Sequence, residues 1–179
     1  RGLEVASIKI EKLKELDDTM RLLREEKHGY QTIVLDTIDR LEMLFQKLIV
    51  QEHNSKPENE KKKIQSIEGI GYGKGHEYLR EKMSTFLDRL NRFCNHDMHV
   101  VIIGHAHVKQ FNPPDLSEGY ERYELKLHKK VASLTKEWCD ALLFANYKQR
   151  ILSKEVNNKT KGKQLGRELS CQRDAAYDA

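Results

Sequence analysis

The stretch Thr32-Ile33-Val34-Leu35-Asp36 is a short β-favouring run that ends in a carboxylate. A second stretch, His99-Val100-Val101-Ile102-Ile103, has the same character and leads into Gly104 and His105. Neither run alternates between apolar and polar residues, which is typical of strands that are covered on both faces of a parallel sheet. The two runs therefore predict an α/β fold.

Amphipathic patterns surround these two runs. Apolar residues recur at helical spacing in the segments 13–23, 41–48 and 79–93, and a further helix is predicted through Val131 and Leu134. Two more strands are predicted, a short one at 3–10 and a buried one at 141–145. This order of strands and helices implies a parallel sheet flanked by helices.

Three segments interrupt the regular patterns. Residues 51–76 are polar, contain Pro57 and four alternating glycines, and are predicted to be an insertion or a mobile loop. Residues 108–123 contain two adjacent prolines and are predicted to be irregular. The tail is predicted to form a basic β-hairpin over residues 148–171.

The composition excludes several classes of protein. Of the 179 residues, 38% are hydrophobic and 34% are charged, and the longest apolar runs are far shorter than the roughly 20 residues that span a bilayer. The cysteines Cys94, Cys139 and Cys171 form no CxxC pair, so reduced thiols in a cytosolic protein are the simplest interpretation. The net charge is only +4, so any affinity for nucleic acid must come from local patches.

Polar side chains follow the predicted strands at their carboxyl ends, where ligands bind in open α/β sheets. They are Asp36, His105, and Asn146 or Tyr147. Asp36 is well placed to hold a hydrated Mg²⁺, because hard cations prefer carboxylate oxygens. A helix N-cap is an equally good interpretation of Asp36, and His105 could be a loop histidine without a role. Asp39 is interpreted as a first-turn acid or a surface residue.

Two other motifs suggest different chemistry. Gly104-His105-Ala106-His107 matches the GHxH metal motif of calcineurin-like phosphoesterases, but the DxH motif of that family has no counterpart, so a metal-dependent phosphoesterase is a minor alternative. Gly71-Tyr72-Gly73-Lys74-Gly75 contains the Gly-Lys pair of a phosphate-binding P-loop. It has Glu68 where the first glycine belongs and Gly75 where Ser or Thr belongs, so a flexible loop is the better interpretation.

In their order, these pieces resemble the phage-encoded nucleotide-binding ATPases of the RecA-like P-loop class, some of which act in single-strand annealing. Residues 30–39 are similar to the Walker B strand of that family, residues 71–75 to its glycine-rich insertion, and residues 100–107 to the strand that carries the γ-phosphate sensor. Weaker similarity continues through 120–147 and 173–179, so that the resemblance covers about residues 3–179.

The resemblance implies a single RecA-like ATPase domain over residues 1–179, with a C-terminal β-hairpin and with ATP and Mg²⁺ as cofactors. It makes Asp36 a catalytic and metal-binding residue and His105 a catalytic residue at the γ-phosphate. Lys126, Lys129 and Lys130 become candidate phosphate-binding residues, with nucleotide held at a subunit interface of a homo-oligomer. The alternative for these lysines is a solvated helix face.

The chain also departs from the family. A member should begin with a strand, a GxxxxGK[ST] loop and a helix, and none of these lies in residues 1–179. We therefore expect the C-terminal part of such an ATPase, which by itself would not hydrolyse ATP. The resemblance further implies a phage protein in the cytoplasm of a bacterial host, acting in DNA recombination or annealing. The alternative function is a non-catalytic nucleic-acid-binding or assembly module.

Local basic patches suggest single-stranded DNA as a partner. Between Lys148 and Arg167 there are seven Lys or Arg residues and one acid, Glu155. Aromatic residues beside cations offer stacking for bases, as in known single-strand binders. The candidate nucleic-acid-binding residues are Lys109, Phe111, Arg122, Lys159, Lys161 and Lys163. A solvated basic surface without a partner is the alternative.

Overall fold

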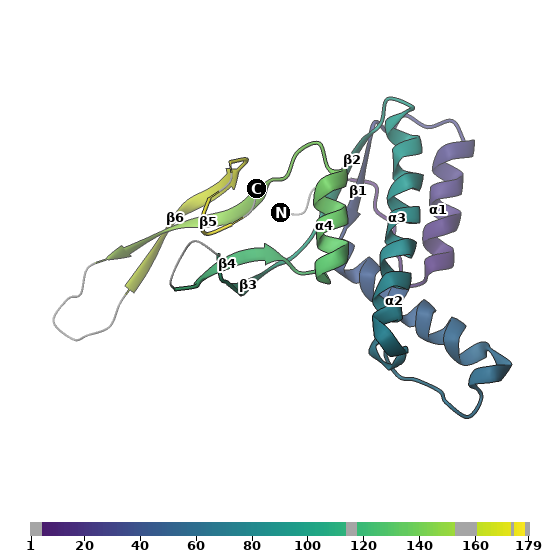
Figure 1. The fold of residues 1–179 in the computed structure, drawn as a ribbon. Helices are drawn as coiled ribbons and strands as arrows, with labels where there is room; N and C mark the ends of the chain where they lie inside the picture. The colour runs from purple at the N-terminus through teal and green to yellow at the C-terminus, as the bar shows by residue number, and fades with distance from the viewer. Residues whose placement is uncertain (1–4, 114–117, 153–160, 173, 178–179) are drawn as a thin grey trace. The chain divides into compact units, whose positions relative to one another are not determined.

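The computed structural model describes residues 5–113, 118–152, 161–172 and 174–177, and gives the backbone alone for 149–152 and 161–165 (Figure 1). The chain divides into two compact units. The helical unit contains residues 1–105 and 126–135, and the hairpin unit contains residues 106–125 and 136–179.

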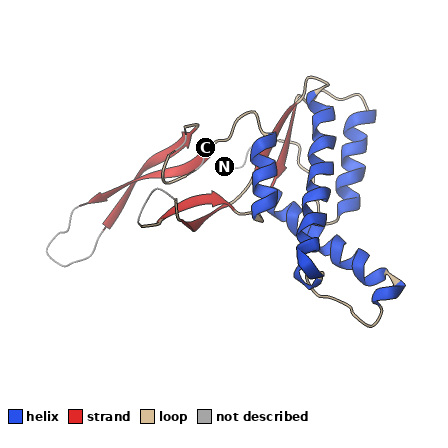
Figure 2. Cartoon of the chain, viewed as in Figure 1, coloured by secondary structure: helices blue, strands red, loops and turns tan. Residues whose placement is uncertain are grey.

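The helical unit holds most of the helices and the parallel strands (Figure 2). Its elements are α1 (Leu13–Glu25), β1 (Thr32–Asp36), α2 (Ile38–Ser55), α3 (Lys74–Cys94), β2 (His99–Ile103) and the first residues of α4 (Lys129–Trp138). Short 3-10 helices at Pro57–Asn59, Ile67–Gly69 and Gly71–Gly73 connect α2 to α3. The helices that the apolar spacing predicts are therefore confirmed.

The core of the helical unit lies where α2, α3 and α4 bury their apolar faces. Its fully buried side chains are Ile38, Leu79, Met83, Phe86, Leu87 and Val131. Phe45 of α2 meets Phe86 of α3 edge to face, with ring centroids 6.2 Å apart. Such aromatic pairs add about 0.5–1.5 kcal/mol beyond the burial of their area, so they fix α2 against α3.

β1 and β2 pair in parallel, with Thr32 opposite His99 and Asp36 opposite Ile103. This register places the carboxyl ends of the two strands side by side, as the sequence predicts. Exposure alternates along both strands, and Val34, Val101 and Ile103 remain exposed. One face of the pair is thus covered by the helices, while apolar side chains of the other face are accessible.

The hairpin unit is built from two antiparallel pairs. β3 (Ala106–Phe111) pairs with β4 (Tyr120–Leu125), and β5 (Phe144–Leu152) pairs with β6 (Lys161–Ser170). The predicted C-terminal hairpin is confirmed, although it begins at Phe144, before residue 148. Together with the parallel pair and the helices, this gives the α/β fold class with a C-terminal β-hairpin that the sequence predicts.

The prediction of an irregular segment at 108–123 is wrong, because residues 108–111 belong to β3 and residues 120–123 to β4. Contacts between the two strands stabilise the hairpin: the rings of Phe111 and Tyr120 lie 5.5 Å apart, edge to face. Pro113 lies two residues after the end of β3, so it belongs to the connection between the two strands.

Two predicted strands are also corrected. Residues 141–143 form no strand, and Phe144 and Ala145 begin β5, which pairs with β6 and not with the parallel strands. Phe144 stacks on Tyr177 at 4.6 Å, so aromatic packing holds it in the hairpin unit. Of the strand predicted at 3–10, residues 5–10 have no regular structure.

The polar segment 51–76 is partly helical. α2 continues to Ser55 and α3 begins at Lys74, so only the middle of the segment forms the connection with its 3-10 helices. Asn54 anchors this connection, because its side chain both donates to the carbonyl of Ile64 and accepts from the amide of Ile64, at 2.8 and 2.9 Å.

Candidate nucleotide site at the strand ends

Asp36 is the last residue of β1 and its side chain is exposed. The N-cap of α2 is Thr37, whose hydroxyl accepts from the amide of Arg40 at 3.4 Å. The N-cap interpretation of Asp36 is therefore wrong, because its neighbour performs that role. Within the described residues, the Asp36 carboxylate has no hydrogen-bond or ion-pair partner, which leaves both oxygens accessible to a ligand. The peptide bond between Asp36 and Thr37 is cis.

His105 lies two residues after β2, and Asp39 of α2 holds it in place. Its ring Nδ1 is 3.0 Å from Oδ2 and 3.1 Å from Oδ1 of Asp39, and its backbone amide donates to Oδ1 at 3.2 Å. The Asp39 side chain is 18% exposed and the His105 side chain 66% exposed. Asp39 is thus more than the surface acid that the sequence suggests: it joins the start of α2 to the segment after β2.

The contacts of Asp39 also set its charge state. Burial alone would raise the pKa of the carboxyl, but hydrogen bonds from the His105 ring, Thr37 and the His105 amide outweigh it, and the pKa lies below its ordinary value. The carboxylate is therefore ionised at neutral pH and can only accept hydrogen bonds.

Of the candidate phosphate-binding lysines, Lys126 contacts His105 through its backbone. The Lys126 amide donates to the His105 carbonyl at 2.7 Å, and the Lys126 side chain is exposed. Lys129 is exposed at the first position of α4. Lys130 forms an ion pair with Glu77 of α3, so its ammonium group already has an acidic partner.

A half-buried polar cluster between α2, α3 and the start of α4 was not predicted from the sequence. Glu42 of α2 accepts the His128 amide at 2.9 Å, and the His128 ring stacks on His76 at 4.0 Å. Burial raises the pKa of Glu42, with the His128 amide opposing that effect. Burial, and then the electrostatic effect of the neighbouring His76, lower the pKa of His128. The only sequence signal for these contacts is that Glu42, His76 and His128 are isolated polar residues beside apolar ones.

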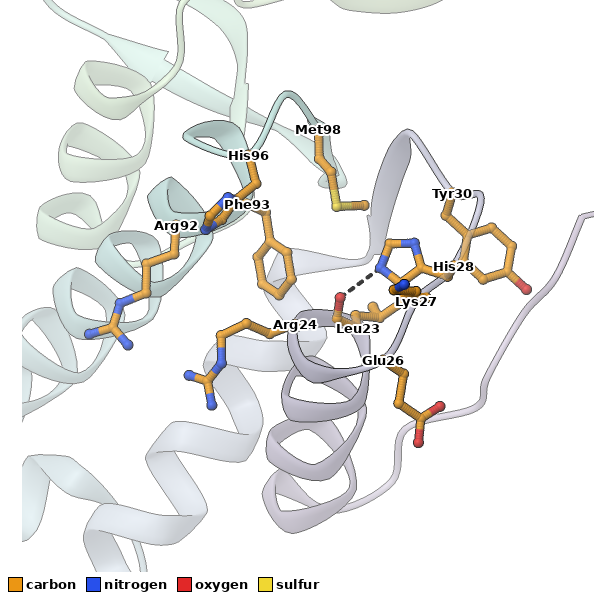
Figure 3. Close-up of a pocket in the computed structure, with 10 residues that line it drawn as sticks. All are labelled: Leu23, Arg24, Glu26, Lys27, His28, Tyr30, Arg92, Phe93, His96 and Met98. Carbon is orange, nitrogen blue, oxygen red and sulfur yellow. Dashed lines mark hydrogen bonds between the residues drawn. The ribbon is translucent and has the colours of Figure 1, made fainter.

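A separate cavity of about 320 Å³ lies at the opposite, amino-terminal ends of the strands (Figure 3). It is lined by residues that precede the strands, such as Tyr30 and Met98, and by the ends of α1 and α3. The His28 ring contacts the carbonyl of Leu23 at 2.6 Å there, so it satisfies the last turn of α1. This cavity contains none of the predicted site residues.

Comparison with known proteins identifies the family. The family model for an AAA domain matches residues 2–172 of the chain. The chain belongs to the AAA domain family. No curated protein and no solved structure matches the chain. The AAA domain match indicates a nucleotide-binding ATPase of the P-loop type, and this family generally uses ATP and Mg²⁺.

The donor set at the strand ends of this AAA domain suits Mg²⁺. Mg²⁺ keeps several waters and is usually bound by one or two carboxylates together with substrate phosphates, and Asp36 supplies one accessible carboxylate. Within the part of the chain that the structure describes, no three His, Cys, Asp or Glu side chains come together to hold a metal. His105 belongs to the helical unit and His107 to the hairpin unit.

The predicted nucleic-acid-binding residues of the AAA domain lie in the hairpin unit. Lys109 is exposed on β3, 3.6 Å from Glu124. Arg122 is only 7% exposed, because its guanidinium group binds Glu124 at 3.0 Å and lies 4.2 Å from the centre of the Phe111 ring. Phe111 and Arg122 thus contact each other in the fold of the hairpin.

The basic tail is only partly described. Lys161 and Lys163 lie in β6, opposite Leu152 and Arg150 of β5, and their side chains are outside the described residues. Lys159 lies outside the described residues altogether. Of the other residues predicted at strand ends, Asn146 and Tyr147 are exposed within β5 and do not follow a parallel strand. In the described residues no helix is long and apolar enough to cross a membrane.

Proposed function

We propose that this chain supplies the Mg²⁺-binding and phosphate-sensing half of the ATP site in a RecA-like ATPase. Asp36 orients Mg²⁺ through water, and His105 contacts the γ-phosphate. Lys126 and Lys129 add positive charge for the phosphates, while Lys130 contributes less because of its pairing with Glu77. ATP with Mg²⁺ supplies the phosphoryl group and neutralises its developing charge.

The observation that carries this proposal is the register of β1 and β2. Asp36 lies opposite Ile103, and His105 follows two residues later, so both polar groups belong to the carboxyl edge of one parallel pair. This is where ligands bind in open α/β sheets. An accessible carboxylate on one strand and a histidine after the next strand are the groups that Mg²⁺ and a terminal phosphate require.

The phosphate-binding loop of the complete site would come from a strand, loop and helix outside residues 1–179. The parallel pair can accommodate such a unit, because one of its faces presents the exposed apolar side chains Val34, Val101 and Ile103. Parallel strands are normally covered on both faces. A P-loop strand beside this pair would bring the loop to the same edge as Asp36.

We further propose that the ATPase is phage-encoded and acts on single-stranded DNA in the host cytoplasm, in recombination or annealing. The hairpin unit supports a DNA role through the basic residues of β5, β6 and their connection. Nucleotide would be held between protomers of a homo-oligomer, with Lys126 and Lys129 close to the interface.

The test uses a polypeptide that carries the P-loop segment in front of residues 1–179. Binding of a fluorescent ATP analogue is measured with and without Mg²⁺. We expect Asp36→Ala to remove the Mg²⁺-dependent part of binding, and Asp88→Ala, an exposed aspartate on α3, to leave it unchanged. Equal Mg²⁺ dependence in both variants would reject the proposed role of Asp36. It would favour the alternative of a non-catalytic nucleic-acid-binding or assembly module.

A further inference from the structure

Asp39 contacts both the ring and the backbone of His105, whereas a simple ion pair would involve the ring alone. Both carboxylate oxygens lie within 3.1 Å of the ring Nδ1, and Oδ1 also accepts the backbone amide of the same histidine at 3.2 Å. One carboxylate therefore fixes the backbone and the ring of His105 together. The second ring nitrogen, Nε2, has no partner within the described residues.

An ionised carboxylate accepts hydrogen bonds and donates none. Nδ1 must therefore carry a proton whenever it contacts Asp39, and the neutral imidazole is held as the Nδ1–H tautomer. In that tautomer Nε2 presents a lone pair, which repels a phosphate oxygen. Nε2 can donate to a phosphate only after the ring takes up a second proton.

We propose that Asp39 is a positioning residue that fixes the tautomer of His105 and makes its contact with an oxyanion depend on protonation of the ring. The ligand is a tetrahedral oxyanion, such as the terminal phosphate of a nucleotide. This inference rests on the proposed function for the identity of the ligand, whereas the tautomer itself does not depend on any ligand.

The elements that flank this pair also carry charged groups. Asp39 and Glu42 come from α2, Asp36 ends β1, and Lys126 follows β4, with its amide bonded to the His105 carbonyl. The nearby Asp39 charge raises the pKa of Glu42, after the larger effect of burial. Of the three carboxyl groups, only Asp39 contacts the His105 ring within the described residues.

Asp39→Asn tests the tautomer with little change in shape. The amide oxygen can still accept the His105 backbone amide, but the amide nitrogen donates, so it pairs with an unprotonated Nδ1. We expect neutral His105 to change from the Nδ1–H to the Nε2–H form, read from long-range ¹H–¹⁵N correlations of the ring. Asp39→Ala, which removes both contacts, should give a mixture, and Asp39→Glu should restore Nδ1–H.

Asp36→Asn is the matched control, because it removes a nearby charge without touching the ring, and it should leave the tautomer unchanged. The same tautomer in the parent, Asp39→Asn and Asp39→Ala would overturn the proposal. Unchanged backbone amide spectra outside residues 36–42 and 103–107 show that the variants retain the fold. If Asp39→Asn does not fold, Asp39→Ala replaces it as the test of the tautomer.

Inorganic sulfate tests the oxyanion contact, because its charge stays constant over the range in which histidine titrates. For the parent chain, we expect the sulfate affinity seen at the His105 Nε2 resonance to fall about tenfold or more from about pH 5.5 to about pH 7.5. In Asp39→Asn, whose neutral ring already donates from Nε2, the fall should be less than about threefold. An equal fall in both overturns the proton dependence. Sulfate could leave the His105 ring resonances of both proteins unchanged while the tautomer still reverses in Asp39→Asn. In that case the positioning role of Asp39 is supported and the proposed phosphate contact is rejected.

Discussion

At the scale of single residues, Asp36 and His105 differ in what holds them. Asp36 is accessible and has no partner within the described residues, whereas His105 is fixed by Asp39. In a version that carries the P-loop, we expect Asp36→Ala and His105→Ala each to lower kcat by about 10²-fold, the usual cost of losing one transition-state contact. Circular dichroism should show an unchanged fold, because neither side chain belongs to the core. A His105→Ala enzyme with the parental rate would reject the sensor role.

The lowered pKa of Asp39 also determines how the stability of the fold should depend on pH. Its pKa is lowered in the folded protein, so its ionised form stabilises the fold above the unfolded pKa of about 3.9. That stabilisation is lost as the pH falls through the lower, folded pKa. We therefore expect the free energy of unfolding of Asp39→Asn to be lower than that of the parent near neutral pH. The difference should shrink on acidification, as measured by urea unfolding at several pH values. A difference that grows on acidification would contradict this account.

The sequence predicts the residues at the ends of the two strands but not how they are held. Asp36 and His105 each follow an apolar run, which is a local signal. Asp39 and His105 are 66 residues apart, and only the pairing of β1 with β2 brings them into contact. The contact of Glu42 with His128 has the same origin, because the two partners are 86 positions apart in the sequence. Such contacts form only when distant parts of the chain pack together, so no local sequence pattern predicts them.

At the scale of elements, the start of α3 depends on close packing at Gly75. A Cβ atom there would lie 2.1 Å from the carbonyl oxygen of Ile67, which is backbone and cannot move aside easily. We expect Gly75→Ala to lower the free energy of unfolding by about 1–3 kcal/mol, the usual cost of overpacking. Gly71→Ala is the control, because its Cβ would meet nothing within 4 Å, and it should change stability by less than about 0.5 kcal/mol. Equal effects in denaturant unfolding would show that packing against Ile67 is not the cause.

The way in which each element is stabilised explains whether it could be predicted from the sequence. The helices α1, α2 and α3 are amphipathic over three turns or more, so their 3.6-residue period is unambiguous. A five-residue apolar run such as 141–145 carries no such period, and its aromatic partner Tyr177 decides its place. The strand β4 is rich in charge, and the ion pair Arg122–Glu124 stabilises the hairpin together with the ring contact between Phe111 and Tyr120.

At the scale of the whole molecule, we expect the 179-residue chain by itself to have negligible ATPase activity. Phosphoryl transfer depends on positioning and electrostatic stabilisation, and the P-loop lysine and amides provide much of both. No GxxxxGK[ST] sequence occurs in the chain. Release of inorganic phosphate from Mg²⁺·ATP should therefore equal the background of a matched Asp36→Ala preparation. Robust turnover that Asp36→Ala abolishes would show that residues 1–179 contain a complete site.

The basic residues of the C-terminal hairpin predict binding of single-stranded DNA. The segment from Lys148 to Arg167 contains seven Lys or Arg residues and one acid, on a chain whose net charge is only +4. Each phosphate that a lysine neutralises releases counterions, with a slope of about −0.7 in log affinity against log salt on single strands. Changing Lys159, Lys161 and Lys163 together to Gln removes up to three contacts, so the slope should become shallower by about 2.

Fluorescence anisotropy with a labelled oligonucleotide across a salt series measures that slope. The matched control changes the run Lys61-Lys62-Lys63 to Gln, which removes the same charge from the connection between α2 and α3. We expect the control to keep the parental slope, because the contacts depend on where the lysines lie and not on the net charge. An equal reduction of the salt slope in the two variants would mean that the chain attracts DNA only through its overall charge. A parent that does not bind at low salt would identify the hairpin lysines as a solvated surface.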